Sequence, residues 1–317
     1  MEPQLTGLYL VTGGAGFIGS HLVEHLLRLG ACVRVLDDFS SGTLANLQEV
    51  ESEVEIINGS ILNQASILAA TQGVDGIFHL AARVSVPESF NLLRESHDVN
   101  LTAALMLIEA AKKQGCPFVF SSSAAVYGST TSLPVTESDN ATNPLSPYGV
   151  QKLAAESYCE VFKQVHEVRG VSLRYFNVYG PRQAFTSPYS GVISKFVAAA
   201  LRNEPLRVFG DGSSTRDFVF VDDVVRANVF AISRAQRFTT ALNIGTGVET
   251  SIASLAHQII QITNSRSPVV YGEPRSGDVK RSVAATGKAM KEIGWSYISG
   301  LQEGLEKTIG SMRTAVI

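Results

Sequence analysis

The stretch Leu8-Tyr-Leu-Val-Thr-Gly-Gly-Ala-Gly-Phe-Ile-Gly19 joins a short apolar run to a glycine-rich turn and the start of an amphipathic segment. The apolar run is typical of a buried strand, and apolar residues recur at helical spacing from Phe17 to Leu29. The turn fits two related spacings, G-x-G-x-x-G and G-x-x-G-x-x-G, with glycines at positions 13, 14, 16 and 19. Such glycines let the backbone approach a pyrophosphate, while the helix N-terminus offers free N–H groups and a partial positive charge. The stretch therefore predicts the strand, turn and helix that open a dinucleotide-binding sheet.

An acidic residue at the end of the next strand supports this prediction. The segment Cys32–Leu36 is strand-like, and Asp37 follows it, 18 residues after Gly19. A carboxylate at this place accepts hydrogen bonds from the adenosine ribose and repels a 2′-phosphate, so we expect NAD rather than NADP. Arg34 points to the other face of the strand from Asp37. A simple strand-to-helix turn is the alternative interpretation, and the agreement of strand, helix and acid argues against it.

Strand-like and helical segments alternate through the first half of the chain. The expected strands are Leu8–Thr12, Cys32–Leu36, Val54–Ile57, Gly76–Ala81, Pro117–Ser121 and Val171–Phe176. The expected helices are Phe17–Leu29, Asn100–Lys113 and Tyr148–Val168. This alternation implies a parallel sheet with helices on both faces. We predict an α/β fold, a doubly wound parallel sheet of the Rossmann type with a smaller C-terminal α+β substrate-binding lobe.

The alternation loosens beyond about residue 180, where proline and glycine clusters interrupt the pattern. We therefore expect residues 1–178 to form the NAD-binding domain and residues 179–317 to form the smaller lobe. Asp217–Val221 and Ala241–Ile244 are apolar strand candidates. The chain is accordingly expected to return to the first domain around residues 215–245.

Composition excludes several classes of protein. The chain has 317 residues, 45% hydrophobic and 17% charged, which is ordinary for a globular enzyme and too apolar for disorder. A net charge of −3 gives no sign of a nucleic-acid partner, and no apolar run approaches the roughly 20 residues of a membrane span. Residues 1–7 lack the basic start of a secretory signal. The cysteines at positions 32, 116 and 159 are few and widely spaced, so we expect free thiols, no metal site and a cytoplasmic location.

Tyr148 and Lys152 are the candidate catalytic pair. They lie four residues apart, so they share a helix face, and a nearby cation favours the phenolate of a tyrosine. The run Phe120-Ser-Ser-Ser-Ala-Ala-Val-Tyr-Gly128 precedes them. A Tyr-x-x-x-Lys pattern alone is common by chance. The other motifs of the chain are what support a catalytic role for it here. For His79, at the end of an expected strand, a packed and hydrogen-bonded core histidine is favoured over a catalytic role.

Together these motifs resemble the extended short-chain dehydrogenase/reductase family, and within it the UDP-glucose and UDP-N-acetylglucosamine 4-epimerases. The resemblance runs from Val11 to about Trp295 in the family's order. Its C-terminal parts are Leu173–Pro181, Phe209–Asp217 and Arg275–Asp278. Members often carry Gly-Asp-Ile after the third strand, whereas this chain has Gly59-Ser60-Ile61, so Ser60 is expected to replace one hydrogen bond near the adenine.

The resemblance implies two sets of binding residues, here given by their numbers in this chain. Those expected at NAD are Gly13, Gly16, Phe17, Ile18, Gly19, Asp37, Ser60, Ile61, Leu80, Ala81, Asn100, Ser121, Tyr148, Lys152 and Phe176. Those expected at a UDP-sugar are Ser85, Ser123, Asn177, Val192, Arg216, Arg275, Asp278 and Ser282. The smaller lobe would then bind the nucleotide sugar.

The reaction implied is NAD-dependent 4-epimerisation of a UDP-hexose through a transient 4-keto sugar. Tyr148 would remove the C4 hydroxyl proton, with Ser123 bonded to the same oxygen and Lys152 lowering the tyrosine pKa. Related 4,6-dehydratases and decarboxylating enzymes usually have an acid where this chain has Ala124 and Ala125, which favours simple epimerisation. Another nucleotide-sugar epimerase, dehydratase or oxidoreductase stays the alternative. A non-catalytic NAD-binding regulator is disfavoured by the intact catalytic residues.

Ser282 bears on the breadth of substrate. In the family a tyrosine four residues after the Arg-x-Gly-Asp aspartate accompanies restriction to UDP-glucose and UDP-galactose, and a small residue accompanies acceptance of N-acetyl sugars. Ser282 therefore predicts that UDP-GlcNAc and UDP-GalNAc are accepted, with an ordinary loop serine as the alternative interpretation. By the same resemblance, the helices expected near 100–113 and 148–168 would form a homodimer as a four-helix bundle.

Overall fold

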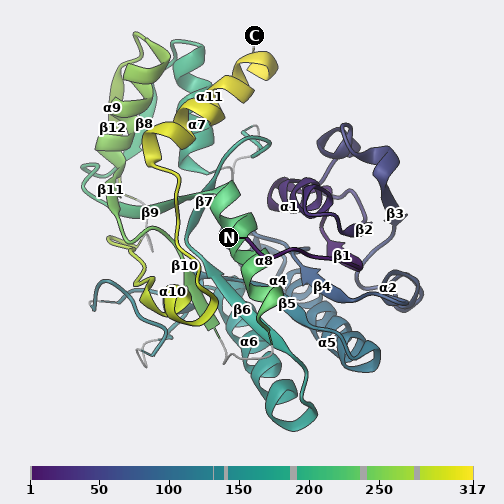
Figure 1. Ribbon diagram of the computed structural model, residues 1–317. Helices are drawn as coiled ribbons and strands as arrows, with labels where there is room; N and C mark the ends of the chain where they lie inside the picture. The colour runs from purple at the N-terminus through teal and green to yellow at the C-terminus, as the bar shows by residue number, and fades with distance from the viewer. Residues whose placement is uncertain are drawn as a thin grey trace.

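The computed structural model describes residues 2–130, 132–138, 142–185, 191–235, 241–274 and 279–316. Its larger lobe is built on one parallel sheet (Figure 1). The strands of this sheet are β1 (Leu8–Thr12), β2 (Cys32–Asp37), β3 (Val54–Asn58), β4 (Gly76–His79), β5 (Phe118–Ser123), β6 (Gly170–Tyr175) and β10 (Ala241–Ile244). They lie in the order β10-β6-β5-β4-β1-β2-β3. The order reverses between β1 and β4, and ligands bind such sheets at the carboxyl ends of the strands beside this switch point.

Helices cover both faces of the sheet (Figure 1). One face carries α1 (Phe17–Arg28) and α8 (Val221–Ser233), and the other carries α2 (Gln64–Thr71), α5 (Ala103–Gln114) and α6 (Pro147–His166). Leu10 and Val11, neighbours on β1, are completely buried in two different apolar clusters, because successive strand side chains point to opposite faces. Both faces are thus packed, which confirms the predicted doubly wound parallel sheet.

Short helical segments connect these elements. They are η1 (Leu44–Leu47), η2 (Glu51–Glu53), α3 (Val86–Asn91), α4 (Leu93–His97), η3 (Asp98–Thr102) and η4 (Ala124–Tyr127). The helix expected at 100–113 is therefore α5 preceded by the single π-helical turn η3. Strand β5 runs two residues further than expected, to Ser123.

A second lobe lies to the side of the large sheet (Figure 1). Its strands form a three-stranded sheet of β11 (Glu249–Ser251), β9 (Thr215–Phe220) and β7 (Asn177–Tyr179), and a two-stranded sheet of β12 (Val269–Gly272) and β8 (Leu206–Phe209). Its helices are α7 (Val192–Leu201), α9 (Ile252–Thr263) and α11 (Leu301–Val316). The helix α10 (Gly287–Ile293) packs against β10. Of the two segments expected to return to the first sheet, 241–244 does so as β10, whereas 215–220 pairs with β7 and β11 instead.

Two distant segments of chain meet beside the carboxyl ends of β5 and β6. The Val135 N–H donates to the Val283 carbonyl over 2.9 Å, and the Ala285 N–H donates to the Val135 carbonyl over 2.8 Å. Asn243 on β10 reinforces the junction by donating its side-chain amide to the Val135 carbonyl over 2.9 Å. We call this junction, residues 135 and 283–285 with Asn243, the seam.

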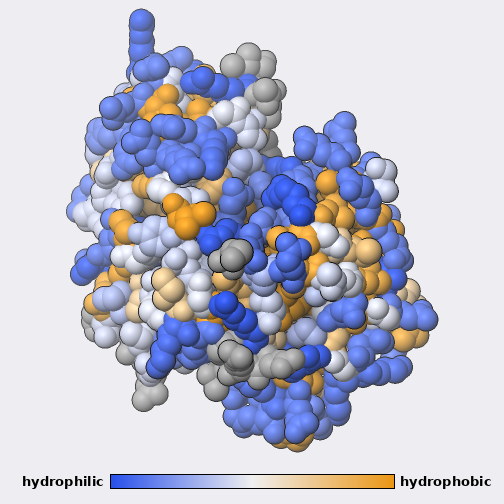
Figure 2. Space-filling model, viewed as in Figure 1, coloured by the Kyte–Doolittle hydropathy of each residue, from blue (hydrophilic) through white to orange (hydrophobic). Residues whose placement is uncertain are grey.

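The visible surface is mostly hydrophilic, in agreement with the composition expected of a globular enzyme. Figure 2 shows a face on which blue hydrophilic residues predominate and orange hydrophobic residues form scattered patches. Within the described ranges, no helix is long and apolar enough to cross a membrane. All three cysteines are free, as expected, with Cys116 and Cys159 buried and Cys32 exposed.

Candidate active site

The glycine turn packs so tightly that side chains are excluded from it. Gly13 has a φ of +69°, and a Cβ there would lie 2.7 Å from the backbone nitrogen of Ala81. A Cβ on Gly19 would overlap the carbonyl oxygen of Gly13. Gly16 is the N-cap of α1. Because it has no side chain, the backbone N–H groups in the first turn of that helix are left open to a ligand. This arrangement fits a bound pyrophosphate, which needs bare backbone at a helix N-terminus.

Asp37 closes the same turn from β2. One of its carboxylate oxygens accepts from the Ala15 N–H and the other from the Phe39 N–H, each over 2.9 Å. Burial raises the pKa of Asp37, and these two hydrogen bonds act in the opposite direction. Arg34 is held by Glu55 at 2.7 Å and by nearby carbonyls, so it is engaged elsewhere. Asp37 therefore places a carboxylate beside the glycine turn, and its contact with an adenosine ribose stays a prediction.

His79 is a core residue, as favoured from the sequence. It is 1% exposed, its Nδ1 lies 2.8 Å from the Thr12 hydroxyl, and its ring stands beside those of Phe118 and Phe120. Burial lowers the pKa of His79 to about 3, and Lys152 adds to this effect. His79 is therefore neutral and serves as packing.

The remaining residues predicted at NAD occupy varied surroundings. Asn100 is buried, and its side chain bonds to both backbone groups of Arg83 and to the side-chain oxygen of Gln151. Ser60 accepts from the Leu62 N–H over 3.2 Å. Phe17 and Ile18 open α1, Leu80 and Ala81 follow β4, and Ile61 is buried. Their contacts with a cofactor stay predictions.

Ser123, Tyr148 and Lys152 are brought together from β5 and α6. Helix α6 begins at Pro147, and its N-cap Ser146 accepts from the Gly149 N–H over 3.1 Å. This start places Tyr148 in the first turn, with its hydroxyl near the Ser123 side chain at the end of β5. Tyr148 is 7% exposed and Lys152 2% exposed, so the pair lies behind Ser123, away from bulk water.

The electrostatics of the pair differ from the sequence-based expectation. Burial raises the pKa of Tyr148 to about 12, and the nearby Ser123 hydroxyl opposes this rise. Burial lowers the pKa of Lys152 to about 7, opposed by the carboxylate of Glu156. The ammonium donates to the Ser121 carbonyl over 2.8 Å and stands 5.8 Å from the centre of the Tyr148 ring. The polypeptide alone therefore does not lower the tyrosine pKa, because the lysine is bonded to a carbonyl and both groups are desolvated.

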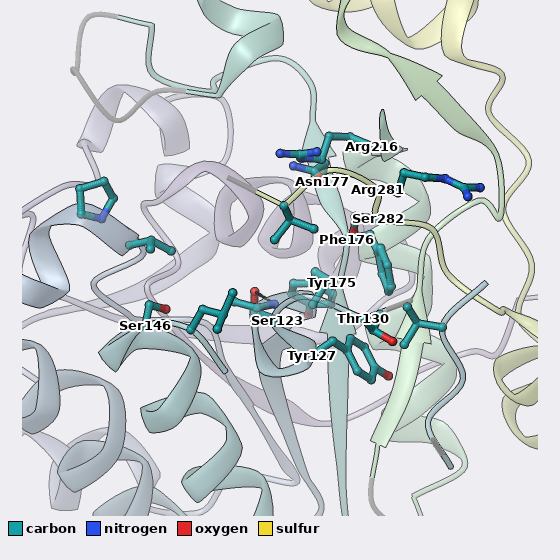
Figure 3. A pocket seen from close by; sticks show the side chains of 18 of the residues that line it. Ser123, Tyr127, Thr130, Ser146, Tyr175, Phe176, Asn177, Arg216, Arg281 and Ser282 are labelled. Carbon is teal, nitrogen blue, oxygen red and sulfur yellow. Dashed lines mark hydrogen bonds between the residues drawn. The ribbon is translucent and has the colours of Figure 1, made fainter. Parts of the chain in front are cut away.

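A cavity of about 760 Å³ opens in front of Ser123 (Figure 3). Five of the residues predicted at the substrate or cofactor line it: Ser123, Phe176, Asn177, Arg216 and Ser282. Of the residues predicted at the sugar, Ser85 and Val192 do not line it: Ser85 caps α3 beside the lining residue Val86, and Val192 begins α7. Tyr148 and Lys152 do not line it either. The predicted Arg275 and Asp278 lie outside the described residues.

Sequence reasoning missed several lining residues, including Tyr127, Thr130, Tyr175 and Arg281. Arg281 is the most informative, because its guanidinium bonds to Glu249 at 2.9 and 2.6 Å and its side chain is 57% exposed. Its place directly before Ser282, a residue already predicted at the sugar, could have indicated that Arg281 also lines the cavity. Figure 3 shows Arg216 and Arg281 at one end of the cavity and Ser123 and Tyr127 towards the other. The cavity therefore has a cationic end and a hydroxyl-rich end.

Comparisons with known proteins agree with this geometry. A family model described as "NAD dependent epimerase/dehydratase family" matches residues 9–245. A UDP-glucose 4-epimerase of Mycolicibacterium smegmatis is 39% identical over 314 residues, covering 96% of this chain and 98% of the relative.

Two solved structures share almost the whole architecture. A Thermotoga maritima UDP-glucose 4-epimerase with UDP-glucose has a TM-score of 0.92 at 36% identity, covering 98% of this chain and 100% of that one. A UDP-N-acetylglucosamine 4-epimerase of Methanobrevibacter ruminantium, in complex with UDP-N-acetylmuramic acid, has a TM-score of 0.92 at 34% identity, covering 98% and 99%. The bare glycine turn, the buried tyrosine–lysine pair and these full-length similarities establish that the chain belongs to the NAD-dependent epimerase/dehydratase family.

Proposed function

We propose that this protein is a UDP-hexose 4-epimerase that uses NAD and passes through a transient 4-keto sugar. Its substrates are UDP-GlcNAc and UDP-GalNAc as well as UDP-glucose and UDP-galactose. The observation that carries the proposal is one cavity with Ser123 at one end, the buried Tyr148 close behind that serine, and Arg216 with Arg281 at the other end. Such a cavity holds a charged diphosphate and presents the attached sugar to an acid–base group.

NAD would be held by the glycine turn, by Asp37 and by Lys152. When bound, it takes up hydride from C4 of the sugar and returns it to the opposite face of the ring. The division of the chain follows from this assignment: residues 1–178, with α8 and β10 returning to the same sheet, bind NAD, and the rest of 179–317 binds the nucleotide sugar. The pairing of β10 with β6 supports such a return.

Tyr148 carries the proton chemistry in this proposal. Its oxygen takes the proton from the C4 hydroxyl as the ketone forms and gives it back as the ketone is reduced. Ser123 lies between the tyrosine hydroxyl and the cavity that it lines, so it would hydrogen-bond to the same sugar oxygen and help the proton transfer. Lys152 adds a cation buried beside the phenol, and the positive charge of oxidised nicotinamide adds to it. Together these charges offset the burial that raises the tyrosine pKa.

The direct test is proton NMR of UDP-glucose and of UDP-GlcNAc incubated with the protein without added cofactor. We expect each to interconvert with its galacto epimer, because NAD is regenerated in every cycle. Nucleotide released by heating is identified by mass, with NAD expected. A 4-keto-6-deoxy product would favour a dehydratase, which Ala124 and Ala125 in the cavity wall argue against. Unchanged sugars together with retained NAD would favour a non-catalytic regulator.

Arg216 is expected to bind the diphosphate. Arg216→Ala should raise KM for UDP-glucose by about tenfold to a hundredfold and leave kcat within a few-fold, because a charged hydrogen bond of roughly 1.5–3 kcal/mol is lost equally from ground and transition states. Steady-state kinetics over a range of substrate concentrations measure this. Arg207→Ala, at an exposed position on β8, is the matched control and should change neither constant. A large fall in kcat with unchanged KM would contradict the assignment.

Ser282 is expected to leave room for an N-acetyl group at C2 of the sugar. It lines the cavity directly after Arg281. Ser282→Tyr should lower kcat/KM for UDP-GlcNAc by roughly a hundredfold or more, since a bulky ring in a packed wall excludes the larger sugar. The loss for UDP-glucose should be much smaller. Competition kinetics with both sugars measure the ratio, and equal losses would assign Ser282 to an ordinary loop position.

We further propose a homodimer and a cytoplasmic location. Helix α6 exposes Val150, Tyr158, Val161 and Val165, between 44% and 66%, along one side. A second copy pairing α5 and α6 with their counterparts would cover this apolar stripe. The free cysteines suit a reducing compartment. Sedimentation of the purified protein tests the assembly, and a monomer at micromolar concentration would contradict it.

A further inference from the structure

A buried ion pair lies one helical turn beyond Lys152. Glu156 and Arg174 are each 6% exposed, and the guanidinium holds both carboxylate oxygens at 2.7–3.2 Å. The Ser122 hydroxyl donates to the same carboxylate. A buried pair of this kind is costly to desolvate and is weak evidence for stability as such. Its neighbours suggest what it does instead.

Three consecutive serines at the end of β5 each have a separate task. The Ser121 carbonyl accepts from the Lys152 ammonium over 2.8 Å. The next hydroxyl, on Ser122, donates to Glu156, and the Ser123 hydroxyl lies near that of Tyr148 and opposes the rise of its pKa. Because these residues are adjacent on one strand, the bond to Glu156 fixes the middle of the segment that positions both catalytic partners.

The same cluster extends to the cavity wall. Arg174 donates to the Tyr127 hydroxyl over 2.8 Å, and that hydroxyl donates to the Asn243 side chain over 2.6 Å. Asn243 belongs to the seam, which continues directly into the lining residue Ser282. Tyr127 itself lines the cavity. One continuous set of buried hydrogen bonds therefore joins the helix of Lys152 to the wall that faces the sugar.

We propose that Glu156 is a positioning residue for the epimerisation, acting through Lys152 on its own helix and through Ser122 on β5. The proposal rests on the function proposed above. Glu156 follows Lys152 by four residues, the spacing that places two side chains on one helix face. Its negative charge also raises the pKa of the buried ammonium against the effect of burial.

The charges around Lys152 support this assignment. Within the described residues, the titratable groups that face it directly or through one partner are Tyr148 and Glu156 on α6, His79 on β4, and Tyr175 and Arg174 on β6. Burial keeps His79 and the two tyrosines neutral near pH 7, by a lowered pKa for the imidazole and raised pKa values for the phenols. Glu156 is the carboxylate that raises the pKa of Lys152 against burial.

Glu156→Gln tests the proposal on the holoenzyme. Without the carboxylate the pKa of Lys152 falls, so the ammonium loses its proton at a lower pH. The alkaline limb of the kcat profile should therefore move down by about one pH unit, and kcat at pH 7 should fall about fivefold. KM for UDP-glucose should change little. Glu160→Gln, one turn further along α6, is the matched control and should leave the profile in place.

Two further variants separate positioning from folding. Glu156→Gln with Arg174→Gln leaves no unpaired buried charge, and should show the same alkaline shift if the carboxylate acts on Lys152. Ser122→Ala keeps the charge, so it should lower kcat by a few-fold without moving the limb. Thermal unfolding and the amount of retained NAD report on each fold. Folded variants with a wild-type profile and kcat would overturn the inference, whereas an inactive wild-type protein would overturn the proposed function instead.

Discussion

Replacing Tyr148 with phenylalanine is expected to lower kcat for UDP-glucose by about 10²–10⁴-fold, the usual contribution of a positioned acid–base group. The phenyl ring fills the same buried space, so the fold is preserved. What is lost is the oxygen that lies near Ser123 and that, in the proposed reaction, exchanges a proton with the sugar. Because the diphosphate end of the cavity is untouched, KM for the nucleotide sugar should stay within a few-fold of the wild-type value.

The measurement is the rate of UDP-galactose formation, together with the amount of NAD that purifies with the variant. Tyr158→Phe is the matched control, since it removes a hydroxyl from the exposed side of the same helix. It should leave the rate unchanged. Activity close to wild type in Tyr148→Phe would refute the assignment, and loss of NAD with activity would point to a binding role.

Replacing Gly19 with alanine is expected to remove most of the retained NAD and to destabilise the fold. The added Cβ would overlap the Gly13 carbonyl oxygen, a backbone atom that cannot move aside as a flexible side chain can. Overpacking of this kind typically costs about 1–3 kcal/mol. Relief requires α1 to withdraw from the turn, which separates the helix N-terminus from the pyrophosphate it would hold.

Gly310→Ala is the control, and its expected effect on the stability of the fold is opposite to that of Gly19→Ala. Gly310 is also helical, in α11, and an added Cβ there meets nothing within 4 Å. Alanine at such a site should stabilise the protein by about 0.5–1 kcal/mol because it restricts the unfolded chain. Thermal unfolding and the absorbance of released nucleotide compare the two variants. A Gly19→Ala protein with wild-type NAD content would contradict the tight-turn account.

Local patterns in the sequence were sufficient for the large sheet. Apolar runs, the glycine turn and the strand-ending acid each concern residues close in the chain, and periodicity carries that information. Local patterns could not predict which sheet segment 215–220 would join. Its apolar composition suits any buried strand, and only its pairing with β7 and β11 decides that it leaves the first sheet.

The proposed catalytic motif could also be found in the sequence, but the charges and burial around it could not. Spacing places Lys152 beside Tyr148, whereas burial and the Ser121 carbonyl decide where the ammonium points. Glu156 and Arg174 come from elements that meet only in the folded protein, so their pairing had no local signal. Arg281 could have been predicted as a lining residue, because it is a cation directly beside Ser282, which the sequence had already indicated.

The wall of the cavity around Ser123 has one more consequence. Val86, Ala124, Ala125 and Phe176 offer the sugar no side-chain hydrogen bonds, and the Tyr127 and Tyr175 hydroxyls donate to Asn243 and Asn228 instead. The cations proposed to bind the diphosphate lie at the far end of the cavity. In the proposed reaction the sugar ring would therefore turn over without breaking a strong contact while its diphosphate stays bound. One tyrosine would then serve both faces of the sugar.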